Sequence, residues 1–254
     1  MTNYQKYVIY IIMKILIGSD IHGNLEALEA VLEEEYDYFV YLGDACDYGP
    51  DPEPVMEILK NETHVFILGN HDNAVAYNVD CNCSEELKEL SIATRKYTRF
   101  VLKTGDIEYL KTLYPVSTFT YDNIKFAAFH GTPKNPLYGY LYPCDRDEKF
   151  KSELTPQRFY LGGSNVEEAH IFLLGHSHFQ FLRFFEKKII LNPGSIGQPR
   201  DGFPLASYAI IDDGNIILKK KKYDLKKTLK KISQMPIDQK HILSLKKILK
   251  TAQI

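Results

Sequence analysis

Five short polar motifs in this chain consist of residue types that bind metal ions or move protons. They occupy residues 19–24 (SDIHGN), 43–44 (GD), 69–72 (GNHD), 130–131 (HG) and 175–178 (GHSH). Each motif directly follows a segment predicted to be a buried strand. Because residues beyond the carboxyl ends of strands in an open α/β sheet converge on one crevice, we expect these side chains to lie close together. Such a gathering of aspartate, asparagine and histidine indicates a metal centre.

Taken singly, these motifs have simpler explanations. GNHD can form an ordinary turn, and a lone histidine at a strand end is often a satisfied core or surface residue. The chain has eight histidines, and the motifs contain five of them: His22, His71, His130, His176 and His178. Five motifs in this order, all at strand exits, are hard to explain by packing alone. Their combination favours a functional site.

The first part of the chain alternates strands and helices. Residues 14–18, 38–42 and 64–68 are short apolar runs, which predict buried strands. Residues 24–35 have apolar positions at helical spacing, and residues 52–60 begin with Pro52, a residue favoured in the first turn of a helix. Two further helices are expected at 84–103 and 106–113. This order predicts a parallel βαβαβ unit.

The second part is rich in strands. Residues 116–120 and 124–129 flank Asp122-Asn123, a hairpin signature, and 179–185 with 188–191 form a second expected hairpin. A strand is expected at 171–174, a strand pair at 206–211 and 215–223, and two helices near the end of the chain. The expected fold is therefore an α/β sandwich of two packed mixed β-sheets flanked by helices. Residues 13–254 form one domain, and residues 73–113 are a candidate helical insertion.

Residues 1–12 are interpreted as an N-terminal extension that starts upstream of Met13, or alternatively as an added edge strand. The apolar run at 7–12 is far shorter than the ~20 residues that a membrane span requires, so no membrane association is expected. It also lacks the cleavage site of a signal peptide. With only four cysteines in 254 residues, the chain has no disulfide framework, and a cytoplasmic location is expected.

Charge is distributed unevenly along the chain. The net charge is −2, yet residues 219–254 contain 12 lysines and only two acids, Asp224 and Asp238. An acidic remainder is expected if carboxylates and neutral histidines bind divalent cations. The lysines fall opposite the apolar positions of the last helices, which predicts a solvated surface; a substrate-facing or polynucleotide-facing surface is the alternative.

Cys81 and Cys83 form a Cys-x-Cys pair that could bind a soft metal or close a strained disulfide. Because no second cysteine pair with zinc-site spacing is present, a structural or incidental role is the favoured interpretation.

The five motifs resemble the signature of the calcineurin-like metallophosphoesterases, which runs DxH, GD, GNH[DE], H and GHxH. The resemblance covers residues 13 to about 223, and the stretches 42–52 (LGDACDYGPDP) and 192–200 (NPGSIGQPR) are similar to the small prokaryotic predicted phosphodiesterases of that superfamily. It implies the metallophosphoesterase fold and a dinuclear centre. The first metal would be held by Asp20, His22, Asp44 and His178, and the second by Asp44, Asn70, His130 and His176, with Asp44 as the bridge.

This nitrogen and oxygen ligand set suits two divalent transition metal ions, with Mn²⁺ expected first and Fe, Ni, Co or Zn as alternatives. The resemblance implies hydrolysis of a phosphodiester or phosphomonoester by a hydroxide that bridges the metals. His71 would protonate the leaving group or stabilise the transition state. Asp72 would hydrogen-bond the His71 ring; a helix N-cap is its alternative role.

Arg200 is a candidate for binding the substrate phosphate, with an ion pair to Asp201 or a structural role near Asn192 as the alternatives. The tyrosine-rich stretch 138–142 either walls the site or packs as an aromatic loop. The expected partner is a small phosphorylated substrate, and a homo-oligomer is left open. The competing functions are a non-catalytic protein-binding scaffold on the same fold and a nuclease. The acidic main body argues against nucleic acid.

Overall fold

The computed structural model describes residues 13–156 and 166–254, so the expected extension at 1–12 lies outside the described residues. In the first sheet the strand order is β10-β9-β1-β2-β3. Its strands are β1 (Lys14–Gly18), β2 (Tyr38–Tyr41), β3 (Val65–Phe66), β9 (Ala206–Asp212) and β10 (Asn215–Lys221). Strands β1, β2 and β3 are parallel, whereas β9 pairs antiparallel with β1 and with β10.

The second sheet has the order β4-β5-β6-β8-β7. Its strands are β4 (Val116–Tyr121), β5 (Ile124–Phe129), β6 (Ile171–Leu174), β7 (Gln180–Phe185) and β8 (Lys188–Pro193). Strands β5, β6 and β8 are parallel, and the hairpins β4-β5 and β7-β8 are antiparallel. Both central turn residues of the first hairpin, Asp122 and Asn123, have positive φ, as a two-residue hairpin turn with the twist of its strands requires.

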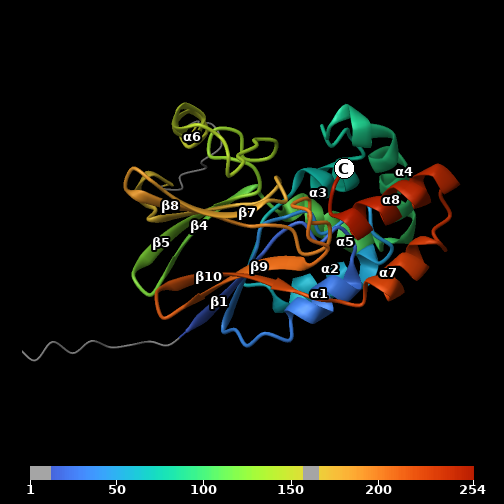
Figure 1. Cartoon of the computed structure of the whole chain (residues 1–254), viewed down its shortest axis with the longest axis horizontal. Helices are drawn as coiled ribbons and strands as arrows, with labels where there is room; N and C mark the ends of the chain where they lie inside the picture. Colours follow the sequence, from blue (N-terminus) through green and yellow to red (C-terminus); the bar gives the residue numbers. More distant parts are fainter. Residues whose placement is uncertain (1–12, 157–165) are drawn as a thin grey trace, which may run out of the picture.

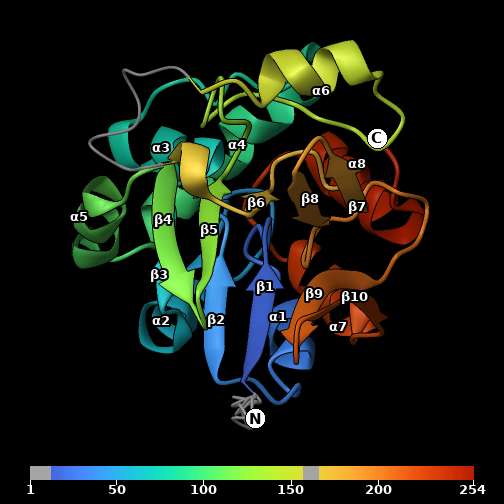
Figure 2. The same cartoon turned by 90° about the vertical axis from the view of Figure 1, so that its left-hand side faces the viewer.

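The two sheets pack face to face, and helices cover their outer faces (Figures 1 and 2). Alternate residues of each strand point into the space between the sheets: Ile15 and Ile17 from β1 meet Ile171 and Leu173 from β6 in one buried cluster. The other residues of the central strands, such as Leu16 and Phe39, are buried against the helices, so these strands are apolar throughout. The expected α/β sandwich of two mixed sheets is confirmed.

Helices lie around the two sheets (Figures 1 and 2). They are α1 (Leu25–Val31), α2 (Pro52–Glu62), α3 (Asn70–Tyr77), α4 (Glu85–Val101), α5 (Thr104–Thr112), α6 (Asp147–Glu153), α7 (Leu225–Ile232) and α8 (Gln239–Thr251), with a short 3₁₀ turn at Val166–Glu168. Helices α1 and α2 pack on the outer face of the first sheet, and α6 packs on the second. The sequence did not predict α6 or α3, the second of which begins inside the GNHD motif.

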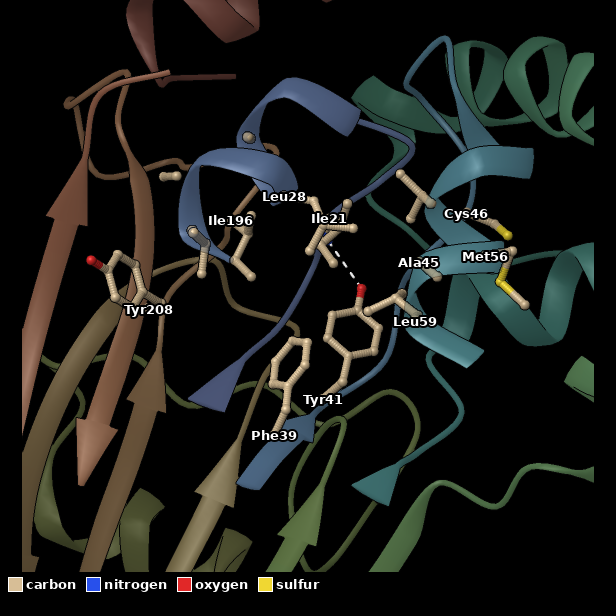
Figure 3. Packing of buried hydrophobic residues seen from close by; sticks show 14 of the residues in the cluster. Ile21, Leu28, Phe39, Tyr41, Ala45, Cys46, Met56, Leu59, Ile196 and Tyr208 are labelled. Atoms are coloured by element: carbon tan, nitrogen blue, oxygen red, sulfur yellow. Dashed lines mark hydrogen bonds between the residues drawn. The ribbon is translucent and has the colours of Figure 1, made fainter. Parts of the chain in front are cut away.

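One hydrogen bond connects this core to the first polar motif. The backbone N–H of Ile21 donates to the hydroxyl of Tyr41 on β2, at 3.1 Å (Figure 3). Ile21 and Tyr41 belong to the same buried cluster as Leu28 and Phe39. The loop that carries Asp20 and His22 is therefore held against β2 by both packing and a buried hydrogen bond.

The lysine-rich region has a structural role that its composition alone did not reveal. Among the described residues, six of its lysines form ion pairs with acidic residues of the main body. They include Lys231 with Glu26 and Asp51, and Lys240 with Glu89; the others are Lys219, Lys220, Lys221 and Lys227. The positive and negative parts of the chain thus offset each other locally. The acidic partners of these lysines are Glu26, Glu33, Glu34, Asp51, Glu89 and Asp201.

Candidate metal centre

The five motifs meet at one place between the carboxyl ends of strands from both sheets. Asp20 and His22 follow β1, Asp44 follows β2, and Asn70 is the first residue of α3. His130 follows β5, and His176 and His178 follow β6. All seven side chains are at most 3% exposed. Burial of so many polar side chains is costly unless each finds a partner.

The backbone turns sharply at these strand exits. Asp20, His22, Asp44, His176 and His178 all have positive φ, between 48° and 63°. Residues other than glycine rarely adopt this left-handed region, so the surrounding structure must compensate for its cost. Clustering of such strain at one polar site is typical of functional centres.

Two groups of ligand atoms are close enough to bind one cation each. Asp20, His22 and His178 form the first group, and Asp44, His130 and His176 form the second. Within each group the ligand atoms all lie within 4.8 Å of one another. Asn70 adjoins the second group, because its Oδ1 lies 2.9 Å from Nε2 of His130.

Backbone carbonyls determine which nitrogen of each ring carries the hydrogen. Nδ1 of His22 lies 3.0 Å from the carbonyl oxygen of Cys46, and Nδ1 of His178 lies 2.5 Å from that of Gln198. A carbonyl oxygen can only accept, so both Nδ1 atoms donate. In the neutral rings, each Nε2 is then a bare lone pair.

These lone pairs face one another in a buried space. Nε2 of His22 lies 3.4 Å from Nε2 of His178, which lies 3.3 Å from Oδ1 of Asp20. Burial lowers the pKa of both histidines, which keeps their rings neutral. Acceptors that face acceptors without a hydrogen between them repel. A cation between them removes the repulsion, so this geometry fits a metal ion.

The second group has the same character. Oδ2 of Asp44 lies 3.3 Å from Nε2 of His130 and 3.7 Å from Nε2 of His22, so this oxygen faces both groups. Oδ2 of Asp44 and Nε2 of His176 are buried and have no hydrogen-bond partner among the described residues. The other Asp44 oxygen accepts the N–H of His71 at 2.8 Å. The geometry thus suits a bridging role for Asp44.

The charges of His130 and Asp44 shift the pKa values of these two groups in opposite directions. Burial opposes a charge on His130, but the Asp44 carboxylate outweighs it and raises the pKa of His130 to about 9. Burial likewise opposes ionisation of Asp44, but His130 and His71 hold its pKa well below the usual range. Without a cation, a proton on His130 therefore neutralises Asp44.

Gly69 is required by the close approach of the loops that hold Asp44 and Asn70. A Cβ added to Gly69 would lie 2.0 Å from Oδ1 of Asp44 and 2.2 Å from its backbone nitrogen. No side chain can occupy that space without displacing the carboxylate.

His71 lies beside the two groups and is oriented by Asp47. Its Nδ1 is 2.8 Å from Oδ2 of Asp47, while Oδ1 of Asp47 accepts from the hydroxyl of Thr94 at 2.5 Å. Burial opposes protonation of His71, but Asp44 and Asp47 raise its pKa above the usual value. Sequence reasoning missed Asp47, although it lies in the stretch 42–52 that resembles the family.

The expected contact between Asp72 and the His71 ring is wrong. The Asp72 carboxylate instead accepts three backbone N–H groups: those of Asp44 at 2.7 Å, Cys46 at 3.1 Å and Gly69 at 3.2 Å. The alternative role of Asp72 as the helix N-cap is also wrong, because Gly69 is the N-cap of α3. Asp72 is the N3 residue and accepts the Gly69 N–H in a capping box. Burial and the nearby Asp44 raise the pKa of Asp72 to about 7.

A family profile, that of the calcineurin-like phosphoesterase superfamily domain, matches residues 13–215. The chain belongs to this superfamily. An uncharacterized protein of Methanocaldococcus jannaschii is 30% identical over 240 residues, 86% of this chain and 91% of that protein. Serine/threonine-protein phosphatase 2 of Escherichia coli is 24% identical over 234 residues, 80% of this chain and 97% of that protein. The crystal structure of a metallophosphoesterase from Sphaerobacter thermophilus has a TM-score of 0.75 at 24% identity, covering 92% of this chain and 98% of that chain.

In this member of the calcineurin-like phosphoesterase superfamily, a cavity of about 290 Å³ opens onto the two groups. Asp44, His71, His176 and His178 line its floor, and its walls include Cys83, Leu87, Tyr140, Tyr142, Arg200 and Ile254. Tyr140 packs over the His176 ring, with 3.9 Å between their centroids, and lies parallel to Tyr142. The tyrosine-rich stretch therefore contributes to the wall of the site.

Arg200 faces this cavity with an incompletely paired guanidinium. Its Nη2 donates to Gln198 at 3.0 Å, and its buried Nε has no partner among the described residues. The alternative ion pair with Asp201 is wrong, because Asp201 pairs with Lys220.

Among the described residues, no helix has both the length and the apolar composition that a membrane-spanning helix requires.

Proposed function

We propose that this chain is a phosphoesterase that uses two divalent cations to hydrolyse a small phosphodiester or phosphomonoester. The observation that carries the proposal is the set of opposed acceptor atoms of Asp20, His22 and His178. Membership of the calcineurin-like phosphoesterase superfamily supports the hydrolase class. The phosphatase name of the Escherichia coli relative supports a phosphate ester as substrate.

The residues present fit the proposed metals. Asp20, His22, Asp44 and His178 would hold one cation, and Asp44, Asn70, His130 and His176 the other. A set of nitrogen and oxygen ligands without thiolate suits Mn²⁺ first, with Fe, Ni, Co and Zn as alternatives. When bound, the cations would offset the charge of the substrate phosphate and lower the pKa of a bound water towards neutrality.

The remaining roles belong to side chains of the cavity. His71 is the proposed proton donor for the leaving oxygen, because its Nδ1 is held by Asp47 and the residue lines the cavity. Arg200 is the proposed contact for a phosphate oxygen, since a guanidinium with free donors matches that geometry. The walls formed by Tyr140 and Tyr142 suit a small aromatic leaving group.

Asp72 supports the proposed site through contacts with the backbone. By accepting the N–H groups of Asp44 and Gly69, it joins the loop of one proposed ligand to the start of α3, where Asn70 and His71 lie. We therefore assign it a positioning role.

Free thiols at Cys46, Cys81, Cys83 and Cys144 support the proposed cytoplasmic location.

A substrate panel tests the proposal. Purified protein is stripped with chelator, reloaded separately with Mn²⁺, Zn²⁺, Co²⁺, Ni²⁺ or Fe²⁺, and assayed on aryl phosphodiesters and aryl phosphomonoesters. We expect hydrolysis that disappears in chelator and returns with metal. Less than one bound cation per chain under metal-replete conditions would instead favour the protein-binding scaffold.

His71→Ala separates catalysis from metal binding. The variant should retain both cations, because the ring is outside the proposed ligand set, while turnover falls by about 10²–10⁴-fold. Normal turnover in His71→Ala would disprove the proposed role. Salt-sensitive binding of single-stranded oligonucleotides, together with their cleavage, would favour the nuclease alternative.

A further inference from the structure

Cys81 and Cys83 converge on one side chain next to the proposed metal centre. Asn82 between them has a left-handed backbone with φ of 52°. This bend brings both sulfur atoms to 3.4 Å from the hydroxyl oxygen of Ser91 on α4. Two thiols two residues apart that contact the same atom are near enough for a disulfide after a modest backbone adjustment.

The two cysteines differ in access. Cys83 lines the cavity together with Asp44 and His71, whereas Cys81 is fully buried behind it. A small solute that enters the cavity therefore reaches the sulfur of Cys83 first. Cys81 is placed to react with Cys83 afterwards.

The loop of this pair is bonded directly to a proposed metal ligand. The side-chain amide of Asn70 donates to the backbone carbonyl of Cys81 at 2.7 Å, which leaves Oδ1 of Asn70 directed at His130. A change in the backbone at Cys81 is therefore transmitted to the orientation of the Asn70 side chain.

We propose that Cys81 and Cys83 are a redox-sensitive thiol pair, which a hydroperoxide converts to a disulfide and which thereby loosens the Asn70 side of the metal centre. The soft-metal reading is less favoured, because among the described residues neither cysteine belongs to a group of three potential ligands. The effect on the metal rests on the proposed function, whereas the disulfide itself does not.

The chemistry of the switch is balanced. The sulfur of Cys83 attacks the terminal oxygen of the hydroperoxide, so an S–O bond forms, the O–O bond breaks, and an alcohol (or water) leaves with the thiol proton. The sulfur of Cys81 then attacks the sulfur of Cys83, the S–S bond forms, and the S–O bond breaks. The hydroxide that leaves takes up the Cys81 proton as water. Two thiols lose two electrons to one peroxide.

The first experiment follows the thiols by mass spectrometry. Reduced full-length protein is titrated with hydrogen peroxide, blocked with an alkylating reagent and digested. We expect a peptide that has lost the alkylation of both Cys81 and Cys83 and two hydrogen masses. Cys144→Ser, which removes an exposed thiol, is the matched control. In this variant Cys81 and Cys83 should form the same disulfide as in the wild type. Sulfinic acid on Cys83 without a disulfide, or preferential oxidation of Cys144, would overturn the proposal.

The second experiment tests the link to Asn70. In metal-free protein, amide hydrogen exchange at residues 70–74 should become faster on oxidation and recover with dithiothreitol. In Cys81→Ser, oxidant should leave the exchange unchanged. Unchanged exchange in the disulfide form of the wild type would overturn the coupling.

Metal titration then reports on the proposed function separately. Oxidation should weaken binding of the second cation by ~10-fold or more, because ligand orientation depends on such outer contacts. If reduced protein binds no cation, the proposed function fails, while the mass and exchange data still decide the thiol switch.

Discussion

Asp47 holds the imidazole of His71, with 2.8 Å between Oδ2 of the aspartate and Nδ1 of the ring. This contact orients the nitrogen that would donate a proton and, together with Asp44, raises the pKa of His71. Asp47→Asn should therefore retain the cations but lower kcat by ~10-fold or more, and move the alkaline limb of the pH–rate profile to lower pH. Metal content and the profile are measured together. An unchanged profile would contradict the role of Asp47.

Loss of a ligand should empty one of the two proposed sites. His178 belongs to the group with Asp20 and His22, so His178→Ala should reduce the metal content from about two cations per chain to about one. Elemental analysis of metal-replete protein gives the number directly. His170→Ala is the control, because His170 is exposed and precedes β6 rather than following it. Two cations in His178→Ala would refute its assignment.

The contribution of His130 to the stability of the metal-free protein should fall as the pH rises. The pKa of His130 is about 9 in the folded chain and 6.5 as its ordinary value, so its contribution is complete below pH 6.5 and is lost as pH rises through about 9. The raised pKa of His71 acts in the same direction. Burial lowers the pKa of His22 and His176, so neither ring takes up a proton in this window.

Urea unfolding in chelator measures this loss, which is at most ~3 kcal/mol for His130. Metal affinity should change in the opposite direction and rise over the same pH range, because the cation competes with the proton on His130. The hydrogen bond with Cys81 lowers the pKa of Cys83 to about 6, so this thiol acts in the opposite direction over the same range. The pH dependence of the wild type is therefore compared with that of His130→Asn, and equal dependences would contradict the assignment. His130→Asn should lose less stability than the wild type as the pH rises from 6.5 to about 9.

Tyr41→Phe should destabilise the loop of the first motif. The substitution removes the acceptor of the buried Ile21 N–H, and an unpaired buried donor costs about 1–3 kcal/mol. Denaturant unfolding tests the effect against Tyr114→Phe, in which the altered side chain is largely exposed. Because Ile21 lies between Asp20 and His22, the metal affinity of Tyr41→Phe should fall as well.

Arg200 should contribute to substrate binding more than to metal binding. Arg200→Ala removes a guanidinium with a free Nε from the cavity wall, so KM should rise by about tenfold while two cations remain. Asp201→Asn, which alters the neighbouring ion pair with Lys220, is the matched control and should leave KM near the wild-type value. An equal effect of both substitutions would indicate a structural role for Arg200.

The sequence by itself determined the order of the strands and the positions of the polar motifs. Apolar runs and turn residues are local signals, and strand exits follow from them. The carboxyl ends of parallel strands meet at one edge of a sheet, so the convergence of Asp20 and Asp44, which follow β1 and β2, could be expected from the sequence. The sandwich fold followed from the same pattern.

Only the tertiary structure decided which partner each polar side chain finds. Asp72 is adjacent to His71 in sequence, yet the ring bonds Asp47, because α3 directs the Asp72 carboxylate back to the N–H groups of Asp44 and Gly69. Likewise, Asp201 pairs with Lys220 and leaves Arg200 to the cavity. Hydrogen bonds and ion pairs between remote segments require the two groups to be placed to within a few tenths of an ångström. Local sequence does not encode this placement.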